Sequence, residues 1–229
     1  MDISKQFSFT DFIAYFFPGA FAIIGIYFLL LLTPAQTMIN NITLDVTTGI
    51  AFLTLSYIVG IVSSGFSRDV IKQIERVTKP KDPQAVVSPG LFSGEIINIF
   101  RELMGINKEE EIVWSPKHFS LCRAFVVEKM PWVTQRLERL ADLALFRRNL
   151  VFPLFIWMVA GIGWGIGIVN NGIKEWGIFL IIASVMVSFF AVRTTIKRMY
   201  KSEEREVQYM YLSFIAGYKM GLFKRKDQT

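Results

Sequence analysis

The clearest candidates for metal chemistry are the only histidine and the only cysteine of the 229-residue chain. His118 and Cys122 stand four residues apart, which places both on one face of a helix at a spacing compatible with two zinc ligands. A structural zinc site needs further ligands, and the sequence has no second pair of His or Cys. We therefore predict no metal site and no cofactor.

Two other stretches have the composition of catalytic or phosphate-binding segments. Glu109, Glu110 and Glu111 form an acidic cluster, which is typical of a helix N-terminus. Glycine occupies every second position from Gly161 to Gly167, but a phosphate loop needs a strand before it and a soluble helix after it. Because no nucleophile is paired with a base either, we predict that the protein is not an enzyme.

The composition indicates a membrane protein. Hydrophobic residues make up 52% of the chain, 21 residues are Phe, and the mean hydropathy is +0.42. A helix of about 20 apolar residues crosses the hydrocarbon core of a bilayer. Four uncharged runs approach or reach that length: 12–32, 46–66, 150–169 and 176–192. We predict an all-α, polytopic membrane protein with four transmembrane helices and a small cytosolic helical module.

The distribution of Lys and Arg predicts the orientation and the domains. Fourteen of these residues lie in 67–149, nine in 193–229 and none in 33–45. Cytoplasmic segments accumulate Lys and Arg, so both termini and the long insert are predicted to be cytoplasmic. The predicted domains are transmembrane helices 1 and 2 (1–66), a cytosolic helical insert (67–149), a transmembrane hairpin (150–193) and a cytosolic amphipathic helix with a basic tail (194–229).

The same distribution bears on localisation and partners. The basic segments beside the membrane are expected to contact the anionic headgroups of a lipid bilayer. The net charge of +6 is explained by this contact, so no direct nucleic-acid binding is expected.

The glycines of the third predicted span form two pairs. Gly161 and Gly165 lie on one side of a helix, and Gly163 and Gly167 lie on nearly the opposite side. Small residues four apart let another helix approach closely. One face is expected to meet a neighbouring helix of the chain, and the other meets either a further helix or a second subunit. The Asn170-Asn171-Gly172 sequence predicts a tight turn between helices three and four.

The second predicted span carries a stripe of small and polar residues. Its members are Gly49, Ser56, Gly60, Ser63 and Ser67. Two interpretations stay open: a helix contact bonded by hydroxyls, or the lining of a pore in an oligomer. The first span contains Pro18, which predicts a kink and frees a carbonyl that must find a partner in the bundle. None of the four runs contains a charged residue or His, which disfavours an ion-coupled transporter.

The segments outside the spans are predicted to be helical. The KPKDPQAVVSPG stretch (79–90) is predicted to be a loop, and Ser115-Pro116 is predicted to begin a helix that Met130-Pro131 breaks. The stretch from Trp132 to Asn149 is then predicted to run directly into the third span as one helix. In the tail, one side of a helix carries apolar residues, which are expected to pack on the insert. They are Val207, Met210, Tyr211, Phe214, Ile215 and Tyr218.

Three short motifs resemble small multi-pass bacterial membrane proteins of anti-phage defence systems, of the kind of the Kiwa membrane subunit. They are YFFPGAF in the first run, SYIVGIVSSG in the second and FRRNL before the third. The resemblance implies a homo-oligomeric inner-membrane sensing or scaffold subunit that acts with a cytosolic protein partner. The alternative is a gated, channel-like pore that perturbs the membrane on activation.

Overall fold

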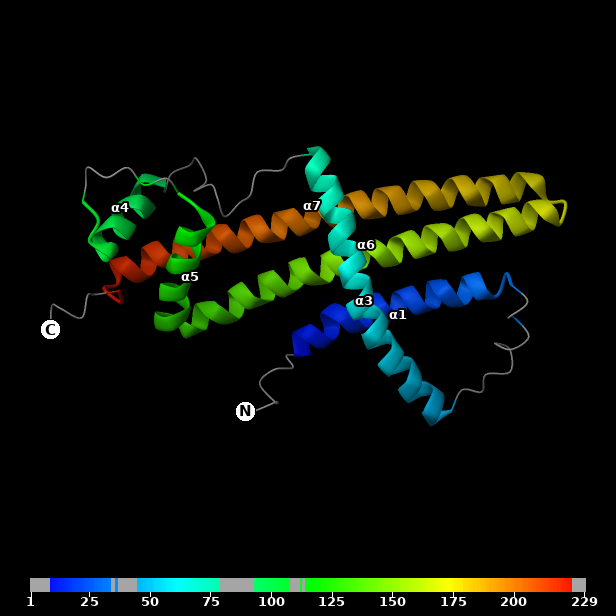
Figure 1. Cartoon of the computed structure of the whole chain (residues 1–229), viewed down its shortest axis with the longest axis horizontal. Helices are drawn as coiled ribbons and strands as arrows, with labels where there is room; N and C mark the ends of the chain where they lie inside the picture. The colour runs from blue at the N-terminus through cyan, green and yellow to red at the C-terminus, as the bar shows by residue number, and fades with distance from the viewer. Residues whose placement is uncertain are drawn as a thin grey trace. The chain divides into compact units, whose positions relative to one another are not determined.

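A computed structural model describes residues 9–33, 36, 45–78, 93–107, 112 and 114–223 of the chain. Its regular elements, in the described part, are all α-helices (Figure 1). They are α1 (Phe9–Leu30), α3 (Val46–Thr78), α4 (Ser93–Met104), α5 (Pro116–Lys129), α6 (Pro131–Asn170) and α7 (Lys174–Lys219). The predicted all-α class is confirmed for these residues. The predicted loop 79–90 and the acidic cluster 109–111 lie outside them.

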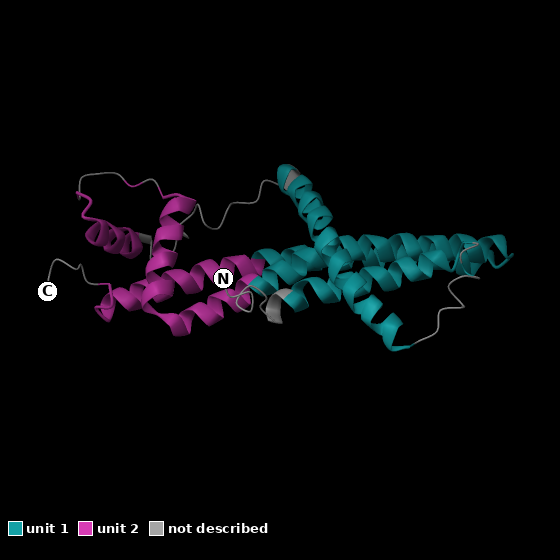
Figure 2. Cartoon of the chain, turned by 60° about the horizontal axis from the view of Figure 1, so that its bottom comes forward, with its two compact units in different colours: residues 1–78, 142–200 teal, residues 79–141, 201–229 magenta. Residues whose placement is uncertain are grey.

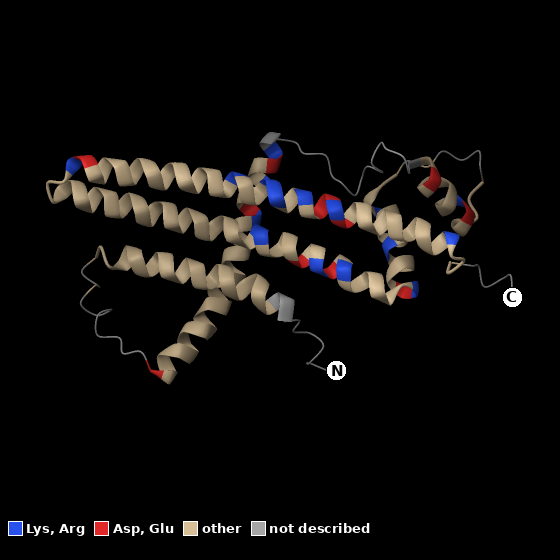
Figure 3. Ribbon diagram, turned by 180° about the vertical axis from the view of Figure 1, so that it is seen from behind, with Lys and Arg blue, Asp and Glu red and all other residues tan. Residues whose placement is uncertain are grey.

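Four helices are long and apolar enough to cross a membrane, which is consistent with a membrane location. The candidate spans are Phe12–Leu30, Val46–Arg76, and the whole of α6 and α7. Charged residues are sparse in the parts of α6 and α7 nearest the turn that joins the two helices, and Lys174 and Glu175 lie beside that turn (Figure 3). Large apolar side chains such as Phe179 and Val187 are exposed on α7, as expected for a surface that faces lipid.

Helices α6 and α7 extend well beyond the apolar runs. The predicted run directly into the third span is confirmed, because α6 is continuous from Pro131 to Asn170. The fourth span and the amphipathic tail helix form one helix of 46 residues. Between α6 and α7 the predicted turn is present, and Gly172 adopts a positive φ of 92° that favours glycine.

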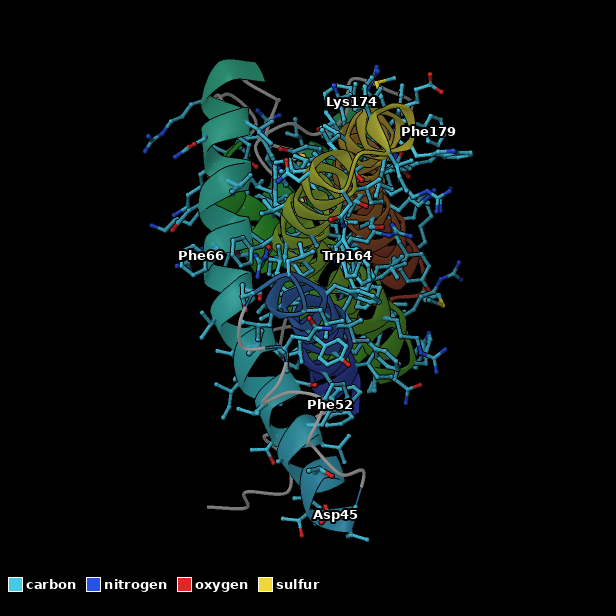
Figure 4. The ribbon with its side chains drawn as sticks, turned by 90° about the vertical axis from the view of Figure 1, so that its right-hand side faces the viewer. Asp45, Phe52, Phe66, Trp164, Lys174 and Phe179 are labelled. Atoms are coloured by element: carbon cyan, nitrogen blue, oxygen red, sulfur yellow. The ribbon has the colours of Figure 1, made fainter. Side chains whose placement is uncertain are left out.

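A reciprocal pair of hydrogen bonds starts α3. The backbone N–H of Thr48 donates to the Asp45 carboxylate at 2.7 Å, and the backbone N–H of Asp45 donates to the Thr48 hydroxyl at 2.8 Å. This arrangement is a capping box, which satisfies N–H groups that the first turn of a helix leaves unpaired. The hydrogen bond from the Thr48 N–H lowers the pKa of Asp45. Figure 4 shows Asp45 at this end of α3.

The chain divides into two compact units (Figure 2). Unit 1 comprises Met1–Thr78 and Asp142–Tyr200, and unit 2 comprises Lys79–Ala141 and Lys201–Thr229. Two of the three unit boundaries fall inside α6 and α7, and the third falls at the end of α3. Helix α6 begins well before its apolar run, and α7 continues well after its own.

Each unit has its own apolar core. In unit 1, a small cluster joins Ile71 of α3, Ala144 and Val151 of α6, and Met199 of α7. The Tyr200 hydroxyl donates to the Glu75 carboxylate at 3.1 Å beside this cluster. In unit 2, a larger cluster contains buried residues of α4, α5, α6 and α7, among them Phe100, Val126, Leu137 and Phe214.

Candidate functional site

A buried amide of α6 hydrogen-bonds to a carbonyl that a proline of α1 has freed. Pro18 has no N–H, so the carbonyl of Ala14, four residues earlier, loses its helical partner. The side-chain nitrogen of Asn149 donates to that carbonyl at 3.0 Å. Asn149 is fully buried, and its Oδ1 has no hydrogen-bond partner in the described part of the chain. The partner expected for the freed carbonyl of α1 is therefore a side chain of α6.

A second proline is matched in the same way from α3. Pro153 frees the carbonyl of Asn149 itself. The Ser67 hydroxyl donates to that carbonyl at 3.5 Å and accepts the backbone N–H of Phe152 at 3.0 Å. Ser67 is also fully buried. Two prolines, one serine and one asparagine thus join α1, α3 and α6 at one polar junction.

Two tryptophans continue the pairing of α6 with α1. The indole N–H of Trp157 donates to the Phe21 carbonyl at 2.9 Å, and that of Trp164 donates to the Phe28 carbonyl at 3.0 Å. Together with Asn149, these donors advance along α6 as their acceptors advance along α1. The two helices therefore run parallel, in one register that three hydrogen bonds define.

Helices α1 and α3 of unit 1 cross at close range. A methyl group at Gly19 would overlap the backbone carbonyl of Ser56, and a methyl at Gly60 would overlap the backbone carbonyl of Tyr15. Both clashes are with backbone, which cannot rotate away as a side chain can. Glycine at 19 and 60 is therefore required for this crossing.

The predicted stripe of α3 mostly faces other helices of the same chain. Ser56, Gly60, Ser63 and Ser67 are buried, whereas Gly49 is exposed and has nothing within 4 Å of an added methyl. Ser67 contributes a hydrogen-bonding hydroxyl, but the buried hydroxyl of Ser56 has no partner among the described residues. At Ser56 it is the backbone carbonyl that lies against Gly19 of α1, and the side chain is fully buried.

The two glycine pairs of α6 contact different helices. Methyl groups at Gly161 and Gly165 would overlap Ser184 and Ile181 of α7. A methyl at Gly163 would come within 2.9 Å of Leu32, after the end of α1, and one at Gly167 would lie 3.8 Å from the same residue. Both pairs are thus accounted for by contacts within one chain. Homo-oligomerisation stays a prediction with no support from these glycines.

The amphipathic side of the tail lies in the core of unit 2. Val207, Met210, Tyr211, Phe214 and Ile215 are buried in the cluster with α4, α5 and α6, and Tyr218 packs against it. The indole N–H of Trp114 donates to the Tyr211 hydroxyl at 2.8 Å. Salt bridges Arg123–Glu206 and Lys219–Glu95 surround this core at 3.1 and 2.7 Å.

In the structure, His118 makes contacts at the start of α5, and Cys122 is buried. Nδ1 of His118 accepts the backbone N–H of Ser115 at 3.1 Å, at the start of α5. The imidazole also packs edge-on against Phe100. Cys122 is fully buried, and burial raises the pKa of its thiol to about 12. The described residues contain no group of three or more His, Cys, Asp or Glu side chains that could hold a metal ion.

Asn149, Trp157 and Trp164 are the contact residues that sequence patterns missed. Each is a single polar or amphipathic side chain in or beside an apolar run, without a repeating partner. The available signal was indirect: each proline within a span leaves a carbonyl four residues earlier without a donor.

No protein-family model matches the chain, and no curated protein and no solved structure matches it either.

Proposed function

We propose that the protein is a sensing or scaffold subunit of a bacterial inner membrane that docks a cytosolic protein through unit 2. In this proposal unit 1 anchors the chain, both termini are cytoplasmic, and the assembly is a homo-oligomer. The proposed role is part of an anti-phage defence system, and the resemblance of the YFFPGAF, SYIVGIVSSG and FRRNL motifs to membrane subunits of such systems supports this proposal.

The observation that carries the proposal is that unit 2 is a helical module with a core of its own. It packs α4, α5, and parts of α6 and α7 around one apolar cluster. Trp132 is 63% exposed on this unit. Exposed tryptophans are enriched at energetically dominant positions of protein interfaces. Unit 2 therefore offers a folded surface with an aromatic anchor for a protein partner.

Charge supports the proposed orientation. Lys and Arg are concentrated in 67–149 and 193–229, and the 33–45 connection has none. Reporter fusions at Gln36 and Asn171 should be active on the periplasmic side, and fusions at Gln84 and after Thr229 on the cytoplasmic side. A cytoplasmic signal at Gln36 would refute this orientation.

The exposed start of α3 supports the proposed homo-oligomer. Val46 is 80% exposed and Ile50 60%, and Gly49 has open space above it. A second copy is able to approach α3 closely at that glycine. In a Cys122→Ala background, Gly49→Cys should form oxidised dimers in membranes, whereas Gly165→Cys, whose side is covered by α7, should not. Absence of dimers from both variants would contradict contact at this end of α3.

Photo-crosslinking tests the docking function. A photoreactive amino acid replaces Trp132 in the full chain, and the same replacement of Trp176, exposed on the first turns of α7, is the matched control. The expected result is a soluble protein that crosslinks to position 132 and does not crosslink to position 176. Deletion of that protein should abolish phage protection, and so should Trp132→Ala. Crosslinks to lipid alone from both positions would reject docking, and ionic conductance in liposomes would favour the channel-like alternative.

A further inference from the structure

One cavity of unit 1 is lined by residues of α1, α6 and α7. Its volume is about 500 Å³, which is within the range of small-molecule sites. Phe28 of α1 and the α6 residues Trp157 and Trp164 form an aromatic wall (Trp164 is labelled in Figure 4). The indole N–H groups donate to carbonyls of α1, and the Phe28 ring centre lies 5.5 Å from that of Trp157 and 6.5 Å from that of Trp164. The cavity therefore has aromatic faces that are held in fixed positions.

The two tryptophans set the length of the cavity. Between them, small residues of α6 and α7 line it: Ala160, Gly161, Ala183 and Ser184. A methyl at Gly161 would overlap Ser184, so these two positions are level with each other, and the antiparallel hairpin brings Trp157 level with Ser188. Trp157 and Trp164 are seven residues apart, about 10 Å along the helix. A lipid acyl chain fills one half of a hydrocarbon core about 30 Å thick, so it is longer than the cavity.

Ser188 supplies an unused hydroxyl at the Trp157 end. The residue lines the cavity and is only 8% exposed. The Ser184 hydroxyl donates to the Leu180 carbonyl at 2.7 Å, and the indole N–H groups are likewise occupied, whereas the Ser188 hydroxyl makes no hydrogen bond to another described residue. No Lys, Arg, His, Asp or Glu is among the described residues that line the cavity. The lining thus offers aromatic faces and one buried hydroxyl without a partner.

We infer that this cavity is a binding site for a small aromatic carbonyl compound, such as an aromatic ketone or a quinone. The rings of the ligand pack on Phe28 and the two indoles, and its carbonyl accepts the Ser188 hydroxyl. Small-molecule sites are typically lined by apolar and aromatic side chains with a few placed polar groups. Packing of ring on ring contributes binding energy beyond that of the buried apolar area.

The lining disfavours other occupants. A lipid acyl chain would extend past the cavity and leave the Ser188 hydroxyl unpaired, and a charged ligand would have no counter-charge. Phe28 and Val187 line the cavity and are 37% and 68% exposed, so a molecule dissolved in the surrounding apolar medium is able to enter from the side. The inference goes beyond the proposed function, because it requires neither a cytosolic partner nor a second copy.

Photolabelling with benzophenone tests the inference. Benzophenone is an aromatic ketone that bonds to nearby C–H groups under ultraviolet light, and mass spectrometry locates the label in the full chain in phosphatidylcholine nanodiscs. Labelling of residues 180–188 should saturate with benzophenone concentration. Diphenylmethane has the same two rings without the carbonyl and should compete. Ser188→Ala should raise the half-saturating concentration of benzophenone about threefold, the factor for an average side-chain hydrogen bond in a membrane protein, and leave the inhibition constant of diphenylmethane unchanged.

A matched pair of variants separates the cavity from the lipid-facing surface. Ala183→Phe fills the cavity and should abolish saturable labelling. Val185→Phe adds the same ring to α7 at a 40% exposed position that does not line the cavity, and should leave labelling unchanged. Ser188→Ala keeps the test decisive even if Ala183→Phe folds poorly.

Four results would overturn the inference. They are labelling that increases in proportion to benzophenone concentration, equal labelling of Ala183→Phe and Val185→Phe, and an unchanged half-saturating concentration in Ser188→Ala. The fourth is competition by dodecane as strong as that by diphenylmethane, which would reject an aromatic ligand in favour of a hydrocarbon chain.

Discussion

The hydrogen bond from Asn149 to the Ala14 carbonyl should increase the free energy of unfolding only because Pro18 is present. Replacing Asn149 with Leu leaves that carbonyl without a donor in a fully buried place. An unsatisfied buried carbonyl costs about 1–3 kcal/mol, and side-chain hydrogen bonds between membrane helices average about 0.6 kcal/mol with a maximum near 1.7. We therefore expect Asn149→Leu to lower the free energy of unfolding by about 1–2 kcal/mol.

Changing Pro18 to Ala restores an N–H that bonds to the Ala14 carbonyl within α1. In that background Asn149→Leu should cost close to zero, because no carbonyl is left unpaired and the unpartnered Oδ1 is removed as well. The expected coupling between the two positions is about 1 kcal/mol, or about fivefold in the unfolding equilibrium. The assay is a double-mutant cycle from unfolding of the purified full chain in mixed micelles titrated with dodecyl sulfate.

Trp157→Phe is the matched control for this cycle. It removes an indole donor to the Phe21 carbonyl, which no proline has freed, so its cost should be the same with and without Pro18→Ala. If Asn149→Leu also costs the same in both backgrounds, to within about 0.3 kcal/mol, the pairing of a proline-freed carbonyl with Asn149 is refuted.

Four further variants and one labelling experiment test the packing of the helices. Gly60→Ala should destabilise unit 1 and Gly65→Ala should be neutral, because an added methyl meets backbone at Gly60 and open space at Gly65; unfolding in mixed micelles compares them. By the same measurement Ser67→Ala should cost about 1 kcal/mol, whereas Ser56→Ala should cost nothing, because the Ser56 hydroxyl has no partner. Burial raises the pKa of Cys122 from 9.0 to about 12, so the thiol contributes full stability below pH 9 and loses it as pH rises toward 12. Thiol labelling of the full chain should accelerate over that range, and an unchanged rate would contradict burial of the thiol.

Hydropathy located the helices well but not their ends. Apolar runs and helical periodicity depend on nearest neighbours along the chain, which is why α1, α3 and the α6–α7 turn were predictable. The continuity of α7 was missed because the charges from Arg193 to Lys201 end an apolar window without breaking a helix. Hydropathy indicates whether lipid or water surrounds a helix. The end of the helix itself is set by residues that adopt a non-helical backbone conformation, such as Gly172 after α6.

The polar junction was predictable only in part. Pro18 implied a carbonyl in need of a donor, and small residues on α3 implied a close contact. The side chain that donates a hydrogen bond to this carbonyl depends on the register of α1 against α6, and no local sequence pattern contains that register. The serines of α3 illustrate the same limit. Ser56 and Ser67 belong to one stripe in the sequence, yet among the described residues the Ser67 hydroxyl is hydrogen-bonded and the Ser56 hydroxyl is not.

The pairing of α1 with α6 also sets an order of events during synthesis. Ala14 and Asn149 are separated by 135 positions in the chain. At about 5–20 residues per second, the ribosome makes Asn149 about 7–27 s after Ala14. Throughout that interval the first apolar helix has an open carbonyl and depends on water or on the insertion machinery for a temporary donor. The N-terminal helix therefore reaches its final hydrogen bonding only after the third apolar helix has been made.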